Sequence, residues 1–228
     1  MEIRKKLRIF IMIIFCLPKT LYFNFRVFPF SVAIKLPILI SLNVKIKEIY
    51  RNCIDVRCSV IKPAMIKLGF GGSDAIISNG GLIFLNKKLG GKLAFYGAAK
   101  FSEGIRIFNN SGTIVFGNNF SANKNCFIAS DGKIEFGNNV LLGWNISIRD
   151  SDGHTVIYDG SPKENIKEVL IGSNVWICAN VNILKGTYIG DNNIISYGSI
   201  VIGLKSQNNM LIGGYPAKAI RENVDWKK

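Results

Sequence analysis

The sequence is poor in histidine and cysteine, the residues on which most metal sites depend. Its 228 residues include one histidine and five cysteines. The cysteines, at positions 16, 53, 58, 126 and 178, form no Cys-x-x-Cys pair and no even framework. This pattern favours a reducing, cytoplasmic location over a disulfide scaffold. Because one histidine and scattered thiols make a poor ligand set, we expect no metal ion.

The apolar run near the N-terminus is too short to cross a membrane. Residues 8–17 follow a basic start, and Pro18 and Lys19 end the run after about ten apolar residues, where a span needs about 20. The start resembles that of a signal peptide, but no small-x-small cleavage motif follows. We therefore expect a short buried helix. The alternative is that residues 1–20 lie on the inner face of a membrane.

Acidic residues are scarce in the first third of the chain. Residues 1–70 contain 13 Lys or Arg and 3 Asp or Glu, a net charge of +10 out of +14 for the whole chain. This charge suits an anionic substrate or a lipid surface. We find no nucleic-acid motif, no basic helix with interleaved aromatic residues and no P-loop, so we expect no nucleic-acid partner.

An aliphatic or aromatic residue returns at every sixth position through much of the chain. The repeat comprises Phe116, Ala122, Ile128, Phe136, Leu142 and Ile148, and then Ile171, Ile177, Ile183, Ile189, Ile195 and Val201. An amphipathic helix would need a period near 3.6, whereas sixes within a period of about 20 indicate a solenoid. We predict an all-β chain with three short strands per coil, in which the sixth residue points inward. Gly and Asn just after it allow left-handed backbone at the bends.

One break interrupts this repeat, and it contains the only histidine. Ile148 and Ile171 lie 23 positions apart, 17 more than one repeat needs, and His154 lies between them. The spacing on both sides is intact, so we predict that residues 149–170 form a loop, the His154 excursion, which leaves the coils in register. The predicted stacking places Ile148 on Ile128 and Ile183, and Ile171 on Phe136 and Ile189.

The repeat divides the chain into three parts. We assign residues 1–70 to a basic and apolar N-terminal cap, 71–204 to the β-helix and 205–228 to a short C-terminal extension. No repeat is visible within the cap, where Leu21–Phe28 and Val44–Ile49 are predicted to be strands.

Three motifs in order resemble the left-handed parallel β-helix of the hexapeptide-repeat acyltransferases. They are Asn174-Val-Trp-Ile-Cys-Ala-Asn, with Cys178 where the family usually has glycine, then Gly190-Asp-Asn-Asn with Ser196-Tyr-Gly-Ser-Ile-Val, and then Gly213-Gly-Tyr-Pro-Ala-Lys-Ala-Ile-Arg. The resemblance covers roughly residues 91–223. Residues 19–40 also resemble the N-terminal segment of sugar O-acetyltransferases from polysaccharide gene sets, which are related to maltose and galactoside acetyltransferases.

The resemblance implies an acetyl-CoA-dependent O-acetyltransferase. Such proteins are typically homotrimers with acetyl-CoA in a groove between two β-helices, and the acceptor expected here is a hydroxyl of a sugar or glycan, in surface polysaccharide biosynthesis. A metal-dependent branch of the fold needs three histidines, which the chain lacks. The competing interpretation is a non-catalytic β-helix, which serves as a scaffold or as a membrane-surface binding module.

His154 is the candidate general base. Acetyl transfer to a hydroxyl needs a group that accepts the hydroxyl proton, and a histidine of near-neutral pKa suits that task. Its place in the excursion matches that of the family's catalytic histidine. Asp152 or Asp150 could accept the other imidazole N–H and set the tautomer, and the alternative for both is an ordinary turn in a polar loop.

Asparagines are candidates for binding the acceptor or stabilising the reacting oxygen. The family has an asparagine before a cysteine at a similar distance from the histidine, which corresponds to Asn125 before Cys126. The alternative is a corner asparagine with positive φ, and Asn145 is a weaker rival.

Basic residues near the C-terminus are candidates for the phosphates of acetyl-CoA. They are Lys205, Lys218 and Arg221, and the alternative is a solvated basic tail. Trp176 is expected either to contact the ligand or to pack at the rim of the core.

Overall fold

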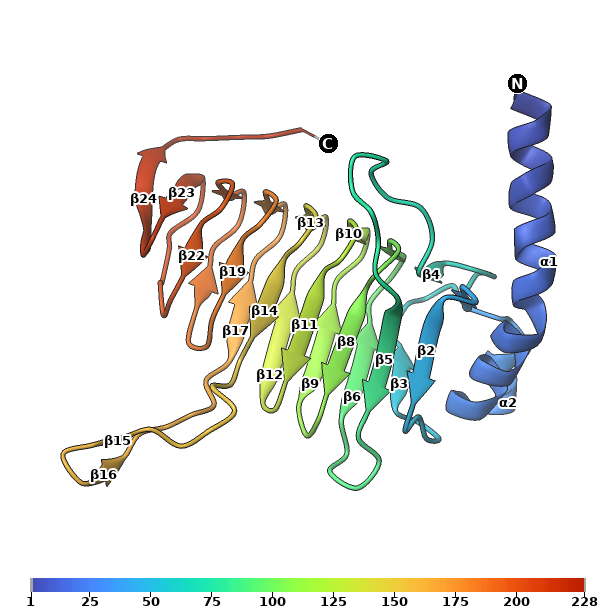
Figure 1. Cartoon of the computed structure of the whole chain (residues 1–228), viewed down its shortest axis with the longest axis horizontal. Coiled ribbons are helices and arrows are strands. Elements are labelled where there is room, and N and C mark those ends of the chain that lie inside the picture. The colour runs from blue at the N-terminus through green and yellow to red at the C-terminus, as the bar shows by residue number, and fades with distance from the viewer. Residues whose placement is uncertain (1, 228) are drawn as a thin grey trace.

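The computed structural model describes residues 2–227, and the side chains of residues 11–227. The chain is a parallel β-helix whose coils stack along one axis (Figure 1). Each complete coil contributes one strand to each of three sheets, which we call A, B and C. We name the bends by the sheets that they join: the A–B corner, the B–C corner and the C–A corner.

Sheet A has nine strands, and all neighbours in it are parallel except the last pair, β23 and β24. In spatial order the strands are β1 (Ile38–Ile40), β4 (Ile66–Leu68), β7 (Ala99–Phe101), β10 (Phe120–Ala122), β13 (Leu141–Leu142), β18 (Trp176–Ile177), β21 (Ile194–Ile195), β23 (Met210–Gly214) and β24 (Ala217–Glu222). The C-terminal extension therefore turns back at β24 and ends the solenoid with an antiparallel strand.

Sheets B and C complete the coils. Sheet B contains β2 (Val44–Lys47), β5 (Gly81–Leu85), β8 (Arg106–Asn109), β11 (Phe127–Ser130), β14 (Ser147–Arg149), β19 (Asn182–Ile183) and β22 (Ile200–Val201). Sheet C contains β3 (Ile54–Val56), β6 (Lys92–Phe95), β9 (Thr113–Phe116), β12 (Lys133–Phe136), β17 (Val169–Ile171) and β20 (Tyr188–Ile189). Neighbouring strands in both sheets are parallel.

The six-residue repeat forms the core as predicted. All twelve of its residues are buried, and their columns run unbroken past the excursion: Ile128 pairs with Ile148 and Ile148 with Ile183, while Phe136 pairs with Ile171 and Ile171 with Ile189. In the earlier coils the column is aromatic, with the rings of Phe95, Phe116 and Phe136 stacked 5.0 and 5.4 Å apart. Each such side chain stabilises the fold by about 1.5–3 kcal/mol through burial.

Asparagines form the corners, as the bends of the repeat predict. Asn119 and Asn139 have φ values of 60° and 58°, the left-handed region that asparagine tolerates. Their side chains also bond from coil to coil, because the Nδ2 of Asn119 donates to the Oδ1 of Asn139 at 2.9 Å. The ladder continues at the same corner, where Asn174 donates to Asn192 at 3.0 Å. Corner asparagines therefore both shape the bends and tie neighbouring coils together.

The solenoid begins earlier than the sequence pattern indicates. Val44–Lys47 is a strand as predicted, but it lies in sheet B beside β5, so the predicted boundary at residue 71 falls inside the β-helix. The repeat is hidden there because 28 residues separate paired positions in β1 and β4, and 33 in β4 and β7. Long corners of unequal length remove the regular spacing without disturbing strand pairing.

The true cap is a pair of helices, α1 (Glu2–Val27) and α2 (Phe30–Ala33). Two predictions were wrong here: Leu21–Phe28 is largely helical rather than a strand, and Pro18 does not end the helix but lies inside it. The reason is packing, because the turns after Pro18 lie on the first coil. The side chain of Asn24 there bonds both the N–H and the carbonyl of Ile38, at 3.1 and 2.7 Å.

Candidate functional site

The His154 excursion leaves the B–C corner as a two-armed ribbon between β14 and β17 (Figure 1). Its tip is a hairpin of β15 (Ile157–Tyr158) and β16 (Ser161–Pro162). Two backbone bonds join the arms nearer the body: Asp152 N–H donates to the carbonyl of Asn165 at 3.0 Å, and Lys167 N–H to that of Asp150 at 2.9 Å. The excursion is thus an ordered element rather than a loose loop.

Asp150 anchors the root of the excursion instead of orienting the histidine. Its side chain is fully buried and accepts three hydrogen bonds, from Ser130 Oγ at 2.6 Å and from the backbone N–H groups of Asp131 and Gly132 at 2.8 and 3.0 Å. All three donors belong to the preceding coil. Both carboxylate oxygens are therefore occupied, and the sequence had offered no sign of this role.

His154 is exposed on the first arm. Within residues 2–227 its imidazole has no side-chain partner, because Asp150 is held by the coil and Asp152 forms an ion pair with Lys185. The structure thus leaves the histidine free to meet a ligand or a second subunit.

Asn125 lies at a different corner from His154. It joins β10 to β11 at the A–B corner, with φ at 60°, so the corner interpretation describes its backbone. Its amide also holds residues 71–80, which we call the 71–80 loop: Oδ1 accepts from Asn79 N–H at 3.0 Å, and Nδ2 donates to the carbonyl of Ile77 at 2.9 Å. Asn145, one coil further on, has φ at 57° and bonds Asn180 at 3.0 Å.

Sheet B separates the two corners within one chain. The A–B corner that carries Asn125 precedes each sheet B strand, and the B–C corner that carries the excursion follows it. A single chain therefore does not bring His154 and Asn125 together.

Cys126, next to Asn125, is a structural residue. Its thiol is buried and donates to the carbonyl of Gly143 at 3.2 Å. Burial raises the pKa of the Cys126 thiol to about 12, so the thiol is neutral near pH 7 and is not a nucleophile.

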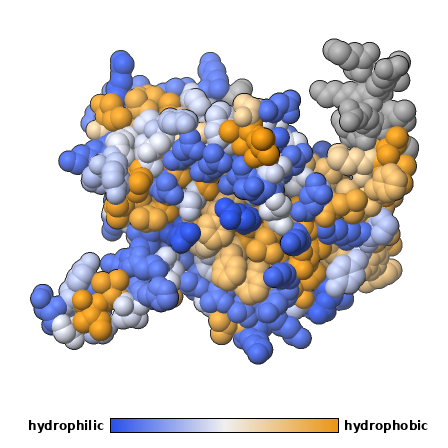
Figure 2. Space-filling model, viewed as in Figure 1, coloured by the Kyte–Doolittle hydropathy of each residue, from blue (hydrophilic) through white to orange (hydrophobic). Residues whose placement is uncertain are grey.

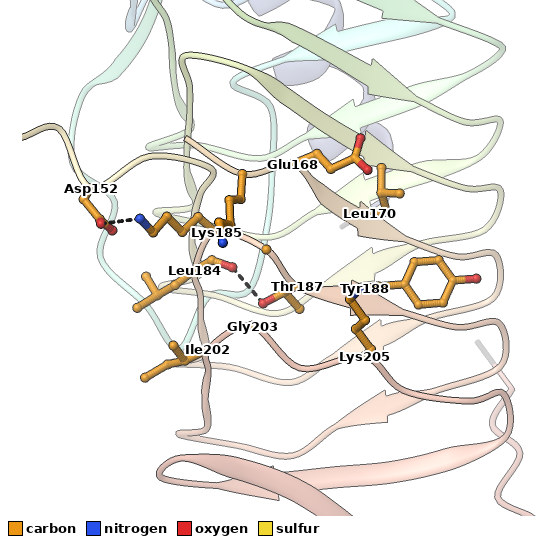
Figure 3. Close-up of a pocket in the computed structure, with 12 residues that line it drawn as sticks. Asp152, Glu168, Leu170, Leu184, Lys185, Thr187, Tyr188, Ile202, Gly203 and Lys205 are labelled. Carbon is orange, nitrogen blue, oxygen red and sulfur yellow. Dashed lines mark hydrogen bonds and ion pairs between the residues drawn. The ribbon is translucent and has the colours of Figure 1, made fainter. Parts of the chain in front are cut away.

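A hollow of about 620 Å³ lies at the root of the excursion (Figure 3). Asp152 and Lys185 face one another on one side of it, and Tyr188 and Lys205 lie on another. The other labelled side chains are the apolar Leu170, Leu184 and Ile202, with Glu168 and Thr187. This lining combines cations with apolar walls, the combination that a ligand with phosphates and a flexible apolar chain requires.

The other predicted ligand residues do not join this hollow. Lys218 and Arg221 are exposed on β24 in sheet A, whereas Lys205 forms a bridge with Tyr188 beside sheet C. Trp176 lies on the outer side of β18 and packs against Trp226, with ring centroids 5.9 Å apart. The indole N–H of Trp226 donates to the carbonyl of Asn174 at 2.7 Å, so the C-terminal segment partly covers Trp176.

Trp176 borders a second hollow of about 320 Å³, on the sheet A side. Its lining includes Trp144, Cys178 and Tyr197. The predicted binding residues therefore fall into two groups on different faces of one chain.

Residues 168–203 match the family model described as bacterial transferase hexapeptide, six repeats. Over these residues the chain resembles the hexapeptide-repeat transferase family. The match covers the coils whose six-residue spacing is most regular and includes most residues around the larger hollow.

Two curated relatives and one solved structure agree with this resemblance. The chain is 36% identical to galactoside O-acetyltransferase of Escherichia coli (strain K12) over 53% of this chain and 60% of that one. It is 34% identical to polysialic acid O-acetyltransferase of Neisseria meningitidis over 43% of this chain and 47% of the relative. The chain thus spans about half the length of the curated relatives that it matches.

The solved structure is that of the polySia-specific acetyltransferase NeuO. It matches with a TM-score of 0.52 at 18% identity, over 84% of this chain and 79% of that one. This likeness confirms the predicted fold of the hexapeptide-repeat chain, a left-handed parallel β-helix.

Sequence reasoning missed two cations of the larger hollow, Lys167 and Lys185. In the regular coils, paired residues lie 18 positions apart, as Trp176 and Ile194 do. An 18-residue step from Lys167 leads to Lys185 and then to Gly203, and all three line the hollow. Counting whole coils in this hexapeptide-repeat chain, rather than searching for motifs, would have found them.

Proposed function

We propose that this chain is an acetyl-CoA-dependent O-acetyltransferase that acetylates a hydroxyl group of a sugar or glycan. The observation that carries the proposal is the lone histidine, exposed on an ordered excursion whose root borders a hollow lined by Lys167, Lys185 and Lys205. The names of the curated relatives, both O-acetyltransferases of sugar compounds, support the same reaction class. We expect surface polysaccharide biosynthesis to be its setting.

The proposed reaction needs only one proton carrier. His154 takes the proton of the acceptor hydroxyl, whose oxygen attacks the acyl carbon of the thioester. The carbon–sulfur bond then breaks, and the imidazolium returns its proton to the departing thiolate. One oxygen–acyl bond forms and one sulfur–acyl bond is lost, so atoms and charge balance without a metal or a redox partner.

The larger hollow is the proposed place for the acyl donor. Its lysines suit the phosphates of CoA, and Leu170, Leu184 and Ile202 suit the apolar arm. Lys218, Arg221 and Trp176 remain candidates for a second part of the ligand, which a neighbouring subunit would bring alongside. Asp152 remains a candidate for orienting His154, although it would have to exchange its Lys185 partner.

A homotrimer would complete the site. Asn125 and the His154 excursion lie at opposite ends of the strands of sheet B. A three-fold arrangement with the sheet B faces inward sets the B–C corner of one copy beside the A–B corner of the next. Each of three sites would then combine His154 of one copy with Asn125 of a neighbour. The proposed location is the cytoplasm, which the five free cysteines fit.

The central experiment incubates the protein with acetyl-CoA and a panel of sugars, nucleotide-sugars and oligosaccharides, followed by mass spectrometry. We expect acetylated product with wild type and little with His154→Ala. A His154→Ala variant of full activity would refute the assignment of the base. Calorimetry without detectable CoA binding would instead favour the non-catalytic scaffold or binding module.

A mixing experiment tests the shared site. His154→Ala and Asn125→Ala chains, each nearly inactive alone, are co-expressed. If the two residues act across subunits, random assembly restores up to about a quarter of the sites, because each partner is intact half of the time. No recovery, together with a monomeric mass by light scattering, would exclude the shared arrangement.

A further inference from the structure

The helix α1 has two apolar sides, and only one of them packs on the protein. The inner side is buried against the first coil and consists of Cys16, Thr20, Phe23, Asn24 and Val27. The Oγ1 of Thr20 accepts from Ile40 N–H at 3.2 Å, so together with Asn24 it covers the exposed edge of β1. The fold thereby fully accounts for the inner side, including its polar residues.

The opposite side of α1 presents a continuous apolar stripe to solvent. We call it the outer α1 face, and it consists of Ile11, Ile14, Phe15, Leu21, Tyr22 and Phe25. The spacing of three and four positions places these residues along one side of a helix. Phe15 and Tyr22, two turns apart, are 65% and 59% exposed. Figure 2 shows apolar side chains gathered along the described part of α1.

The surface beside this stripe is also apolar and basic. Phe30 and Ile34, on and just after α2, are 66% and 59% exposed and extend the apolar area. Six basic residues and one acidic residue occur in residues 1–27. Among the described cations, Arg26 and Lys35 are exposed near this surface, whereas the Nζ of Lys19 donates to backbone carbonyls of the first coil. The helix already packs through its inner side, so its packing does not require this exposed apolar surface.

The position of α1 makes the face accessible to a flat partner. The helix runs across the N-terminal end of the solenoid, roughly perpendicular to its axis (Figure 1). Its inner side contacts β1, so the outer α1 face points away from the β-helix. Nothing else in the described chain lies beyond this end.

We propose that the outer α1 face docks on the surface of a lipid bilayer that contains anionic lipids. The apolar stripe would enter the boundary between headgroups and acyl chains while the cations meet lipid phosphates, the arrangement of an interfacial amphipathic helix. Among the described helices none is long and apolar enough to cross a membrane. Charge complementarity favours lipid over a second α1, which would bring the same cations together.

The test uses the full chain and flotation with vesicles. One vesicle is pure phosphatidylcholine, and the other also contains phosphatidylglycerol. We expect binding to the anionic vesicles that weakens as salt is added. In the double variant Phe15→Glu/Tyr22→Glu, binding should fall about tenfold or more, because two aromatic side chains no longer enter the lipid.

A matched control carries the same added charge elsewhere. Ile77 and Tyr215 are 93% and 77% exposed and lie outside α1, so Ile77→Glu/Tyr215→Glu should bind vesicles as wild type does. No binding by wild type, or equal loss in both double variants, would overturn the proposal. So would dissociation of an oligomer by Phe15→Glu/Tyr22→Glu without a change in vesicle binding, because the face would then join copies of the chain.

A failure here is distinguishable from a failure of the proposed function. Acetyl transfer to a soluble sugar should be the same in wild type and in Phe15→Glu/Tyr22→Glu. The reason is that α1 lies at the N-terminal end of the solenoid, whereas the excursion leaves the solenoid several coils further along (Figure 1). Activity without vesicle binding would refute only the docking proposal.

Discussion

Two segments leave the solenoid, and different chemistry holds each of them. The 71–80 loop leaves the A–B corner and is held mainly by neutral amides. Two exposed or half-buried contacts add to them: the Nζ of Lys124 donates to the carbonyl of Ile76 at 3.2 Å, and Ser78 Oγ donates to Glu103 at 3.0 Å. The His154 excursion leaves the B–C corner and is held by one buried carboxylate, Asp150, with three donors. In both cases the contact is made with another coil: Asn125 lies two coils after the 71–80 loop, and the donors to Asp150 lie on the coil before the excursion. A parallel β-helix can therefore carry insertions without losing register.

The difference lies in what each segment presents to solvent. The 71–80 loop contains a single titratable residue, Asp74, whereas the excursion carries the only histidine and a cluster of charged side chains. The two segments also lie at opposite ends of the strands of sheet B. In the proposed homotrimer they would form the two walls of a site between neighbouring copies, with the titratable groups mainly on the wall formed by the excursion.

The largest expected effect is on catalytic activity, and it distinguishes the His154 excursion from the 71–80 loop. His154→Ala should lower kcat by about 10²–10⁴-fold, because a general base is lost, and should leave thermal unfolding unchanged, because the side chain is exposed. Asp74→Ala, the matched change in the 71–80 loop, should leave kcat within a few-fold of wild type. Steady-state kinetics with the acceptor found by the panel provide the measurement. Equal losses in both variants would remove the functional distinction between the walls.

The next effect concerns the buried anchor of the excursion. Asp150→Ala leaves three donors near a buried site without their acceptor, so we expect a loss of about 2–4 kcal/mol in the free energy of unfolding. Asp150→Asn keeps one acceptor oxygen and should lose less. Denaturant unfolding of both variants measures the effect. If Asp150→Ala were as stable as wild type while kcat collapsed, Asp150 would act on the reaction rather than as an anchor.

A smaller effect is expected at the anchor of the 71–80 loop. Asn125→Ala removes two hydrogen bonds. It also places alanine at φ 60°, a left-handed conformation that alanine disfavours, so we expect about 1–3 kcal/mol of destabilisation. Asn125→Gly relieves the backbone cost and should be milder. Asn145→Ala serves as the control in kinetics, since it occupies the same corner one coil away. A larger loss of kcat in Asn125→Ala than in Asn145→Ala would support its role in the site.

The smallest expected effect is at the partly exposed ion pair of the excursion. Lys185→Ala removes the pair with Asp152, and such a pair is worth at most about 1 kcal/mol. We expect instead a higher KM for acetyl-CoA, most evident at low ionic strength, because a cation near the phosphates is lost. Lys88→Ala, an exposed lysine in a loop elsewhere, is the control. An unchanged KM at all salt concentrations would exclude Lys185 from the donor site.

The core was predictable from the sequence where coils have constant length. Ile171 and Ile189 could be stacked correctly because three repeats of six separate them, and the excursion could be located because Ile148 keeps its own column. The earlier coils follow the same pairing, as Val44 with Gly81, but their corners vary in length and hide the period. Regular spacing is thus a sufficient sign of this fold and not a necessary one.

Other features depend on contacts that no local pattern records. Helix α1 continues past Pro18 because Thr20 and Asn24 bind the edge of β1, a tertiary contact. The sequence does not distinguish Asp150 from Asp152. In the structure, the preceding coil supplies three hydrogen-bond donors to Asp150 and none to Asp152. For the same reason motif matching indicated His154 as a candidate but missed Lys185, which lines the larger hollow only through the stacking of coils.

The regular stacking of the coils also fixes a distance. In sheet B, four strand spacings separate β2 in the first coil from β14, where the excursion begins. At about 4.8 Å per spacing, the excursion starts about 19 Å along the axis from the coil that α1 covers. With α1 flat on lipid, the number of coils would set the height of His154 above the bilayer. A sugar next to a lipid headgroup would be too close to the membrane, and a unit further along a growing chain would be within reach.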